Sequence, residues 1–182
     1  MLALILLTDS RRDARASAGG ELIPLEEQDR SLWDRRQILD SALALRAPGP
    51  YQTQAVIAAL HAAAATPEAT DWIQMAALYR ALFGWTPSPV VDLNAAVAHG
   101  LAHGIEEALT RIAALEAGGE LERYHLLPAA KTDLLRRIGR HPEAAAAYMQ
   151  ALQLVTNPTE RRFLERRLAV AGEAEPYPQA GR

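Results

Sequence analysis

The sequence contains no cysteine. This excludes both a disulfide framework and a zinc site built on thiolates. Aromatic residues are also scarce, at 5% of 182 residues, and alanine fills many of the apolar positions. Because alanine has the highest helix propensity and a very small side chain, this composition favours closely packed helices over a core built on large rings.

Neither an excess of basic charge nor a long hydrophobic run is present. The chain carries 19 Lys and Arg against 22 Asp and Glu, a formal net charge of −3, whereas DNA-binding domains usually carry a clear basic excess. The apolar segment from Met1 to Leu7 is followed at once by Asp9 and Arg11. It is too short for a membrane span of roughly 20 residues, and a signal peptide would place its positive charge before the apolar stretch. We interpret it as part of a core helix cut from a longer chain. We expect a cytoplasmic protein without membrane or direct nucleic-acid contact.

Glycine and proline divide the sequence into segments with helical spacing of apolar residues, and no stretch alternates convincingly with the period of a strand. Ser88 and either Thr70 or Asp71 are suitable N-caps, Pro50 suits a first helical turn, and Gly139 suits a helix stop. We therefore predict an all-α fold, an array of antiparallel helical hairpins in one domain over 1–171, followed by a disordered tail over 172–182. The predicted helices number about nine and span 2–17, 28–46, 50–65, 71–84, 89–103, 105–117, 121–138, 142–155 and 158–170.

An internal similarity indicates tetratricopeptide-like repeats at about 88–117 and 121–157. Superposing Ala108 on Ala144 gives a period of 36 residues, close to the roughly 34 residues of a tetratricopeptide unit. In the second copy Ala144 and Ala151 allow close helix approach, and Tyr148 lies between them. An ordinary alanine-rich helical hairpin would look similar, and on either interpretation a stack of hairpins presents an extended concave surface to partners.

Two constellations could carry chemistry, and both favour a structural interpretation. His99 and His103 have the spacing of two metal ligands on one helix, but Gly100 follows His99 where a zinc protease has glutamate, so solvent-facing histidines are the better interpretation. Ser10 lies between Asp9 and two arginines, without the strand-turn-helix elbow of a nucleophilic serine. The sequence therefore predicts ion pairs there, and no catalytic residue, metal site or cofactor.

Two clusters of charge suit contacts with a protein partner. Trp33, within the segment Asp29 to Asp34, either fills a gap in the core or forms part of a partner-contacting edge, since Trp and Arg are enriched in interface hot spots. Arginines at 161, 162, 166 and 167 make the last predicted helix basic, which suits either a solvated face or contact with an acidic surface.

Several motifs occur in an order that resembles one family. They include Leu6-Leu-Thr-Asp-Ser-Arg-Arg12, Asp29-Arg-Ser-Leu-Trp-Asp34, Gly49-Pro-Tyr-Gln52, Gln54-Ala-Val-Ile-Ala-Ala59, Pro87-Ser-Pro-Val-Val91 with Leu93-Asn94, Tyr124-His-Leu-Leu127, Leu134-Leu-Arg-Arg-Ile-Gly-Arg140 and Glu160-Arg-Arg-Phe-Leu164. Together they resemble the tetratricopeptide-like C-terminal extension of bacterial RNA polymerase sigma factors of the extracytoplasmic-function type. The resemblance covers about residues 2–168.

The resemblance implies a regulatory, protein-binding domain that modulates transcription initiation. Its expected partners are the sigma regions of the parent chain, RNA polymerase or a small partner protein. The alternative is a small-ligand sensor with a pocket between hairpins lined by Trp72, Tyr79 and His125, and a metal-dependent hydrolase is a distant third. The candidate protein-binding residues are Asp9, Arg11, Arg12, Asp29, Arg30, Trp33, Asp34, Tyr51, Gln52, Asn94, Arg161 and Arg162.

Overall fold

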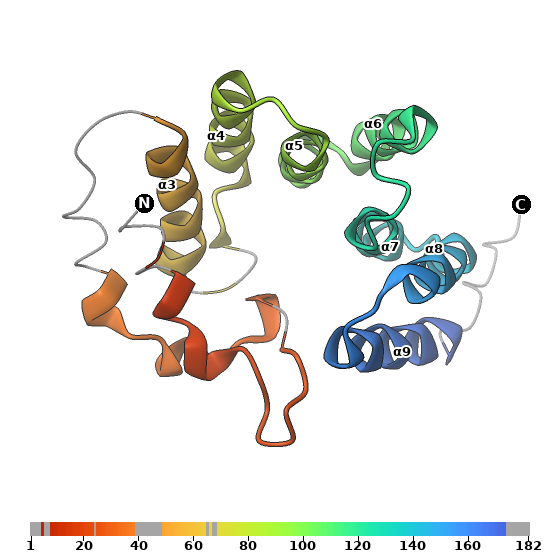
Figure 1. Cartoon of the computed structure of the whole chain (residues 1–182), viewed down its shortest axis with the longest axis horizontal. Helices are drawn as coiled ribbons and strands as arrows, with labels where there is room; N and C mark the ends of the chain where they lie inside the picture. The colour runs from red at the N-terminus through yellow and green to blue at the C-terminus, as the bar shows by residue number, and fades with distance from the viewer. Residues whose placement is uncertain are drawn as a thin grey trace, which may run out of the picture. The chain divides into compact units, whose positions relative to one another are not determined.

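The chain is all-helical in a computed structural model that describes residues 5, 8–23, 25–38, 49–64, 66 and 69–173 (Figure 1). This confirms the predicted fold class. Over these residues the only β pairing is an isolated bridge between Ala16 and Leu22. The 3-10 helices are η1 (Arg12–Ala14), η2 (Leu25–Glu27) and η3 (Arg30–Leu32), and the α-helices are α3 (Pro50–Ala63), α4 (Trp72–Trp85), α5 (Pro89–His103), α6 (Ile105–Gly118), α7 (Leu126–Arg137), α8 (His141–Leu154) and α9 (Pro158–Glu173).

Helices α3, α4 and α5 begin where the capping residues predict. Asp71 accepts a hydrogen bond from the backbone N–H of Gln74 at 2.9 Å, and Ser88 accepts one from that of Val91 at 3.2 Å. Each bond satisfies an N–H group that the first turn of the helix leaves without a partner. Pro50 occupies the first turn of α3, where its missing N–H costs nothing.

Among the described residues up to 38, the structure differs from the two long helices predicted over 2–17 and 28–46. Asp29 accepts from the N–H of Ser31 and starts η3, which ends after three residues. Asp34 then accepts from the N–H groups of Arg36 and Gln37 at 2.9 and 3.1 Å, so that a new helix begins at 35. Because two aspartates each cap a separate turn, the predicted continuous helix is broken near its start. The predicted helical residues 39–46 lie outside the described part of the chain.

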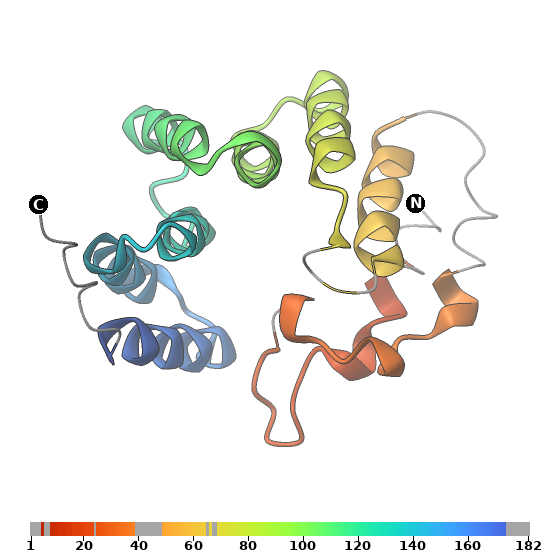
Figure 2. The same cartoon turned by 180° about the vertical axis from the view of Figure 1, so that it is seen from behind.

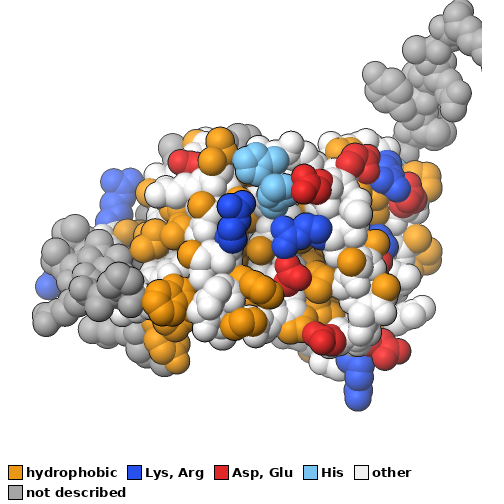
Figure 3. Space-filling view, turned by 90° about the horizontal axis from the view of Figure 1, so that it is seen from above, with side chains coloured by type: hydrophobic (Ala, Val, Ile, Leu, Met, Phe, Trp, Pro, Cys, Tyr) orange, Lys and Arg blue, Asp and Glu red, His pale blue; other side chains and the backbone are white. Residues whose placement is uncertain are grey.

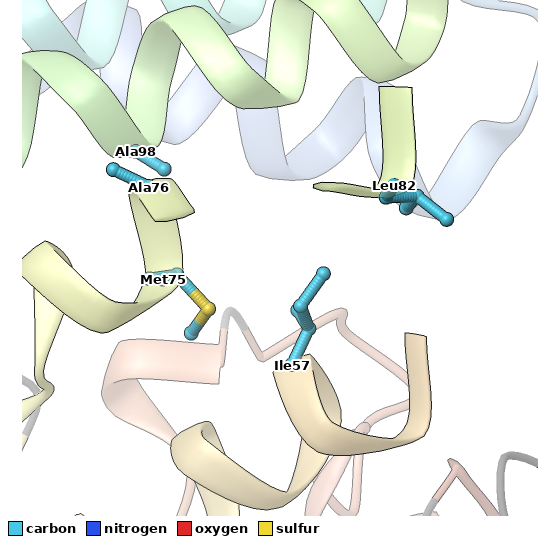
Figure 4. Packing of buried hydrophobic residues seen from close by; sticks show 5 residues of the cluster. All are labelled: Ile57, Met75, Ala76, Leu82 and Ala98. Atoms are coloured by element: carbon cyan, nitrogen blue, oxygen red, sulfur yellow. The ribbon is translucent and has the colours of Figure 1, made fainter. Parts of the chain in front are cut away.

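Contacts divide the chain into two compact units, residues 1–104 and 105–182. The boundary falls at Gly104, inside the first predicted repeat, so the two helices of that repeat belong to different units. In the N-terminal unit α3 packs on α4, and α4 on α5. Their core is a cluster of buried side chains, shown in Figure 4: Ile57, Met75, Ala76, Leu82 and Ala98.

In the C-terminal unit each helix from α6 to α9 packs on the next one along the chain (Figures 1 and 2). Helices α7 and α8 form the hairpin predicted as the second repeat, although α7 begins at Leu126 rather than near 121. Ala144 and Ala151 are fully buried and Tyr148 nearly so. Gly139, in the turn between the helices, has a φ of 75°, which strongly favours glycine.

Side-chain ion pairs join neighbouring helices of the C-terminal unit. Nζ of Lys131 on α7 lies 2.7 and 3.1 Å from the two carboxylate oxygens of Glu116 on α6. Arg140 pairs with Glu143 at 2.6 Å and with Glu106 at 3.2 Å. On the face shown in Figure 3, acidic and basic side chains are interspersed. None of the helices described is long and apolar enough to cross a membrane.

Candidate functional site

A tryptophan and two arginines pack together in the segment that precedes α3. Trp33 is 5% exposed and therefore belongs to the interior. Cζ of Arg30 lies 4.8 Å, and Cζ of Arg11 5.7 Å, from the centroid of the Trp33 ring. At these distances a guanidinium is attracted by the electron-rich face of an indole. We call Arg11, Arg30 and Trp33 the arginine–tryptophan cluster.

Arg30 connects this cluster to the end of α3. Its Nη1 donates to the carbonyl oxygen of His61 at 2.5 Å and to that of Ala64. The last carbonyl groups of a helix have no partner within the helix and carry partial negative charge. Arg30 therefore supplies both a hydrogen-bond donor and a positive charge where α3 needs them.

Asp9 and Arg12 form an ion pair near the cluster, as the sequence predicts. The hydrogen bond from Arg12 lowers the pKa of the Asp9 carboxyl, and Nε2 of Gln37 also donates to Asp9 at 3.3 Å. Ser10 is buried, and its carbonyl oxygen accepts from the N–H of Asp34 at 2.8 Å. These contacts join the residues around 10 to those around 34.

Asp29 and Asp34 act as helix caps. Hydrogen bonds from Ser31, through its side chain and its N–H, lower the pKa of the Asp29 carboxyl. Since both carboxylates accept backbone N–H groups, each has a local structural role in addition to any contact with a partner.

The remaining predicted residues are more accessible. Tyr51 and Asn94 are exposed, and Gln52 is half-buried beside Gly49. Arg161 and Arg162 lie on α9 of the C-terminal unit and are exposed, and Nη2 of Arg161 donates to the carbonyl oxygen of Val155 at 2.9 Å. The structure thus groups Arg11, Arg30 and Trp33 tightly and places the α9 arginines in a different unit.

A cleft of about 410 Å³ opens beside the arginine–tryptophan cluster. Arg11 lines it together with polar side chains from α3, α4 and α5. Leu25 and five further aliphatic side chains form much of the remaining wall. The lining residues are Thr8, Arg11, Leu25, Gln54, Ile57, Ala58, His61, Tyr79, Leu82, Val90, Val91 and Asn94.

Two titratable groups in the cleft are held neutral by their surroundings. Burial, followed by the charges of Arg11 and Arg30, lowers the pKa of His61 to about 4. Its ring also meets that of Trp72 edge-on, with centroids 5.6 Å apart. Burial raises the pKa of the Tyr79 hydroxyl. At neutral pH the cleft therefore presents one charged group, the Arg11 guanidinium, with neutral polar groups around it.

The pocket predicted from Trp72, Tyr79 and His125 is not this cleft. Only Tyr79 lines it. His125 belongs to the C-terminal unit, where its Nε2 lies 2.8 Å from a carboxylate oxygen of Glu160. A second cavity, of about 450 Å³, lies between α6, α7 and α8 and is lined by residues that include Glu116 and Lys131, already paired with each other.

His99 and His103 lie next to each other on α5, with ring centroids 4.7 Å apart. Among the residues described, no group of three or more His, Asp or Glu side chains could hold a metal ion. The pair thus lacks the third protein ligand that a zinc site needs, within that part of the chain.

Comparisons with known proteins place the arginine–tryptophan cluster in a recurring segment. Residues 1–47 match a family described as a family of unknown function (DUF6596). The chain is also 44% identical over 174 residues to an uncharacterized protein of Rhizobium meliloti (strain 1021). That alignment covers 92% of this chain and 41% of the relative, so the chain spans less than half of the relative's length. No solved structure matches.

His61 and Gln54 are the site residues that sequence reasoning missed. Gln54 begins a motif that carries the family resemblance, but only the tertiary packing shows that it and His61 line the same cleft. The exposed apolar side chains of α4 were also missed. Ile73, Phe83 and Trp85 are 66%, 40% and 56% exposed, and a helix with apolar residues all round gives no sign of which face is solvated.

Proposed function

We propose that this chain is the regulatory, protein-binding domain of an extracytoplasmic-function sigma factor. It docks on the sigma regions, on polymerase or on a small partner protein, and it thereby changes the fraction of active sigma factor. A coupling free energy of about 1–3 kcal/mol between docking and activity would change output by about 5- to 150-fold.

The ordered motifs and the length of the Rhizobium relative support this proposal. The motifs that resemble the sigma-factor extension are spread over about residues 2–168. The relative has more than half of its length outside the aligned region. Such a length leaves room for sigma regions in the relative, as the proposal requires.

The observation that carries the protein-binding part is the exposure of large apolar side chains on α4. Ile73, Phe83 and Trp85 together expose aliphatic and aromatic surface on one helix. Tryptophan and other aromatic residues are enriched in protein interfaces, and the few residues that dominate binding are often Trp, Tyr or Arg. A partner that covers Trp85 would remove the exposed part of its ring from water.

The predicted contact residues divide by their accessibility. Arg12, Tyr51, Asn94 and Arg162 are exposed and can meet a partner directly. Trp33 is buried and Arg30 is engaged with α3, so these two affect docking chiefly by holding the N-terminal segment in place.

The test is a binding assay between this chain and the sigma regions of its parent protein. We expect saturable binding at micromolar concentration or tighter. Trp85→Ala should weaken binding by roughly 30-fold or more if Trp85 is a hot spot worth about 2 kcal/mol. Its control is Met149→Ala, which removes another half-exposed apolar side chain, from α8 of the C-terminal unit.

Promoter output in the full-length factor gives the second measurement. If alanine at Arg12, Tyr51, Asn94 and Arg162 leaves output unchanged, these residues do not contact the regulated partner. If the chain binds neither the sigma regions nor polymerase, and Trp85→Ala has no effect on output, the proposal is wrong.

The cleft supports a second candidate function, a small-ligand sensor. Its volume of about 410 Å³ lies within the range of small-molecule sites, about 300–1,000 Å³. Its lining differs from the pocket predicted from the sequence, and the chemistry of that lining is specific enough to define a ligand class.

A further inference from the structure

Arg11 differs from the arginines whose side-chain partners are described above. Arg12 pairs with Asp9, Arg30 donates to two helix-end carbonyls, and Arg140 pairs with two glutamates. Arg11 makes a contact with the Trp33 ring, but no carboxylate or carbonyl oxygen among the described residues accepts from its guanidinium.

The surroundings of Arg11 disfavour its charge. Burial lowers its pKa, and the nearby charges of Arg15 and Arg30 lower it further. A half-buried cation without an acceptor costs free energy, which an anion at the guanidinium would recover. The charges of Arg15 and Arg30, which act on Arg11, add to the positive potential around its guanidinium.

Among the described residues, no acidic side chain lines the cleft. Around Arg11 it supplies neutral hydrogen-bonding groups, the amides of Gln54 and Asn94 and the hydroxyl of Tyr79. Because burial keeps Tyr79 protonated, its hydroxyl can donate to an anion. The rest of the wall, from Ile57, Leu82 and Val91, is apolar.

We propose that this cleft binds a small organic carboxylate, with the carboxylate on the Arg11 guanidinium and the apolar body against Ile57, Leu82 and Val91. The planar guanidinium offers two parallel N–H donors that match the two oxygens of a carboxylate. The aliphatic wall and the single lining cation favour a monoanion with an apolar body over inorganic phosphate. This site deepens the sensor candidate and does not depend on docking to sigma regions.

Binding would link three helices. The lining residues come from the N-terminal segment, α3, α4 and α5. A ligand held by Arg11 at one side and by α5 at the other binds the folded arrangement and not the unfolded chain. It should therefore raise the thermal stability of the N-terminal unit in proportion to its occupancy.

The experiment is a titration of the whole chain with matched pairs of probes at constant ionic strength. Hexanoate and benzoate are compared with hexanamide and benzamide, which have similar shapes but no charge, and with inorganic phosphate. Binding is measured by calorimetry and by the rise in the unfolding midpoint. We expect saturable binding of a carboxylate probe, at least ten-fold weaker binding of its amide, and no preference for phosphate.

Variants assign the binding to Arg11. Arg11→Gln should weaken carboxylate binding at least ten-fold, whereas Arg12→Gln, one residue away and 74% exposed at its side chain, should leave it unchanged. If Arg11→Gln does not fold, Asn94→Ala at the exposed edge of the cleft replaces it and should weaken binding several-fold. Equal binding of acid and amide, tighter binding of phosphate, or unchanged affinity in the cleft variants would each overturn the proposal. So would the absence of binding by both carboxylates up to 10 mM, about the weakest affinity that a site of this size would show.

The outcomes are independent of the docking test. Carboxylate binding is measured on the chain alone, and docking is measured with the sigma regions. If the chain binds carboxylates but not sigma regions, the cleft proposal stands and the sigma-factor proposal is wrong. If it binds sigma regions but not carboxylates, the sigma-factor proposal stands and the cleft proposal is wrong.

Discussion

Replacing Arg30 with alanine removes three contacts that a single guanidinium makes. Its Nη1 donates to the carbonyl oxygens of His61 and Ala64, and its Cζ lies 4.8 Å from the Trp33 ring centroid. The two hydrogen bonds join η3 to the end of α3, and the ring contact holds Arg30 against Trp33, which follows η3 directly. The N-terminal unit should therefore lose stability through this one position.

The magnitude follows from the type of each contact. A hydrogen bond that involves a charged group contributes about 1.5–3 kcal/mol, and a partly desolvated cation–π contact about 1–2 kcal/mol. These terms do not add fully because they share one side chain. We expect Arg30→Ala to lower the free energy of unfolding by about 2–4 kcal/mol, and Arg30→Lys, which keeps the charge but not the fork, by roughly half of that.

The assay uses the tryptophans of the protein. All three, at 33, 72 and 85, lie in the N-terminal unit, so their emission during urea unfolding reports on that unit. Arg12→Ala is the matched control, because it removes a solvent-exposed ion pair, which contributes little to stability. If Arg30→Ala costs no more than Arg12→Ala, the contacts to His61 and Ala64 do not stabilise the unit and the reasoning is wrong.

Two further predictions concern pH and backbone conformation. The pKa of His61 is about 4 in the folded chain and about 6.5 in the unfolded chain, so the unfolded state binds more protons between these pH values. The free energy of unfolding should therefore be unaffected by His61 above about pH 6.5 and fall by about 2–3 kcal/mol as the pH drops toward 4. His61→Gln should remove that part of the pH dependence of the tryptophan-detected unfolding, and an unchanged slope would contradict the assigned pKa. Gly139→Ala should destabilise the C-terminal unit by about 1–2 kcal/mol, because alanine is strained at a φ of 75°. Nothing lies within 4 Å of the new methyl group, so a steric clash does not contribute. The measurement is urea unfolding monitored by circular dichroism. Gly118→Ala, at the end of α6 with equal space around it, should have no such cost, and equal destabilisation in both variants would refute a conformational cause.

The helices from α3 onward could be predicted because their limits depend on local chemistry. A side-chain oxygen at Asp71 or Ser88 needs only the N–H groups two or three residues ahead, and proline at 50 or 89 fixes its own backbone. These signals lie within a few residues of one another in the chain. Pattern alone therefore located the ends of α4 and α5 to within one or two residues.

The first 38 residues were harder to predict because their structure depends on distant partners. The contact from Arg30 to Ala64 crosses 34 positions, and the one from Gln37 to Asp9 crosses 28. No periodicity in the sequence encodes such contacts. Two aspartates that could equally have been surface residues of one helix instead cap separate turns.

The candidate site was predicted in pieces. Arg11 and Asn94 were both chosen as candidates, yet nothing in their spacing shows that they line the same cleft. Trp33 could have been a core residue or an exposed one, and tertiary packing decided that its ring is buried, with Arg11 and Arg30 over it. The missing step in each case was the tertiary contact, not the chemistry of the residue.

The pairing of Lys131 with Glu116 has a practical consequence, because Lys131 is the only lysine in the chain. Apart from a terminal amine, an amine-directed label, cross-linker or sensor surface can react with the protein at this one position on α7. Such chemistry leaves every side chain of the N-terminal unit unmodified, including those of the cleft and of α4. Lysine cross-linking is consequently a poor way to map a partner on that unit, whereas coupling through Lys131 yields a homogeneous immobilised sample for measuring what the unit binds.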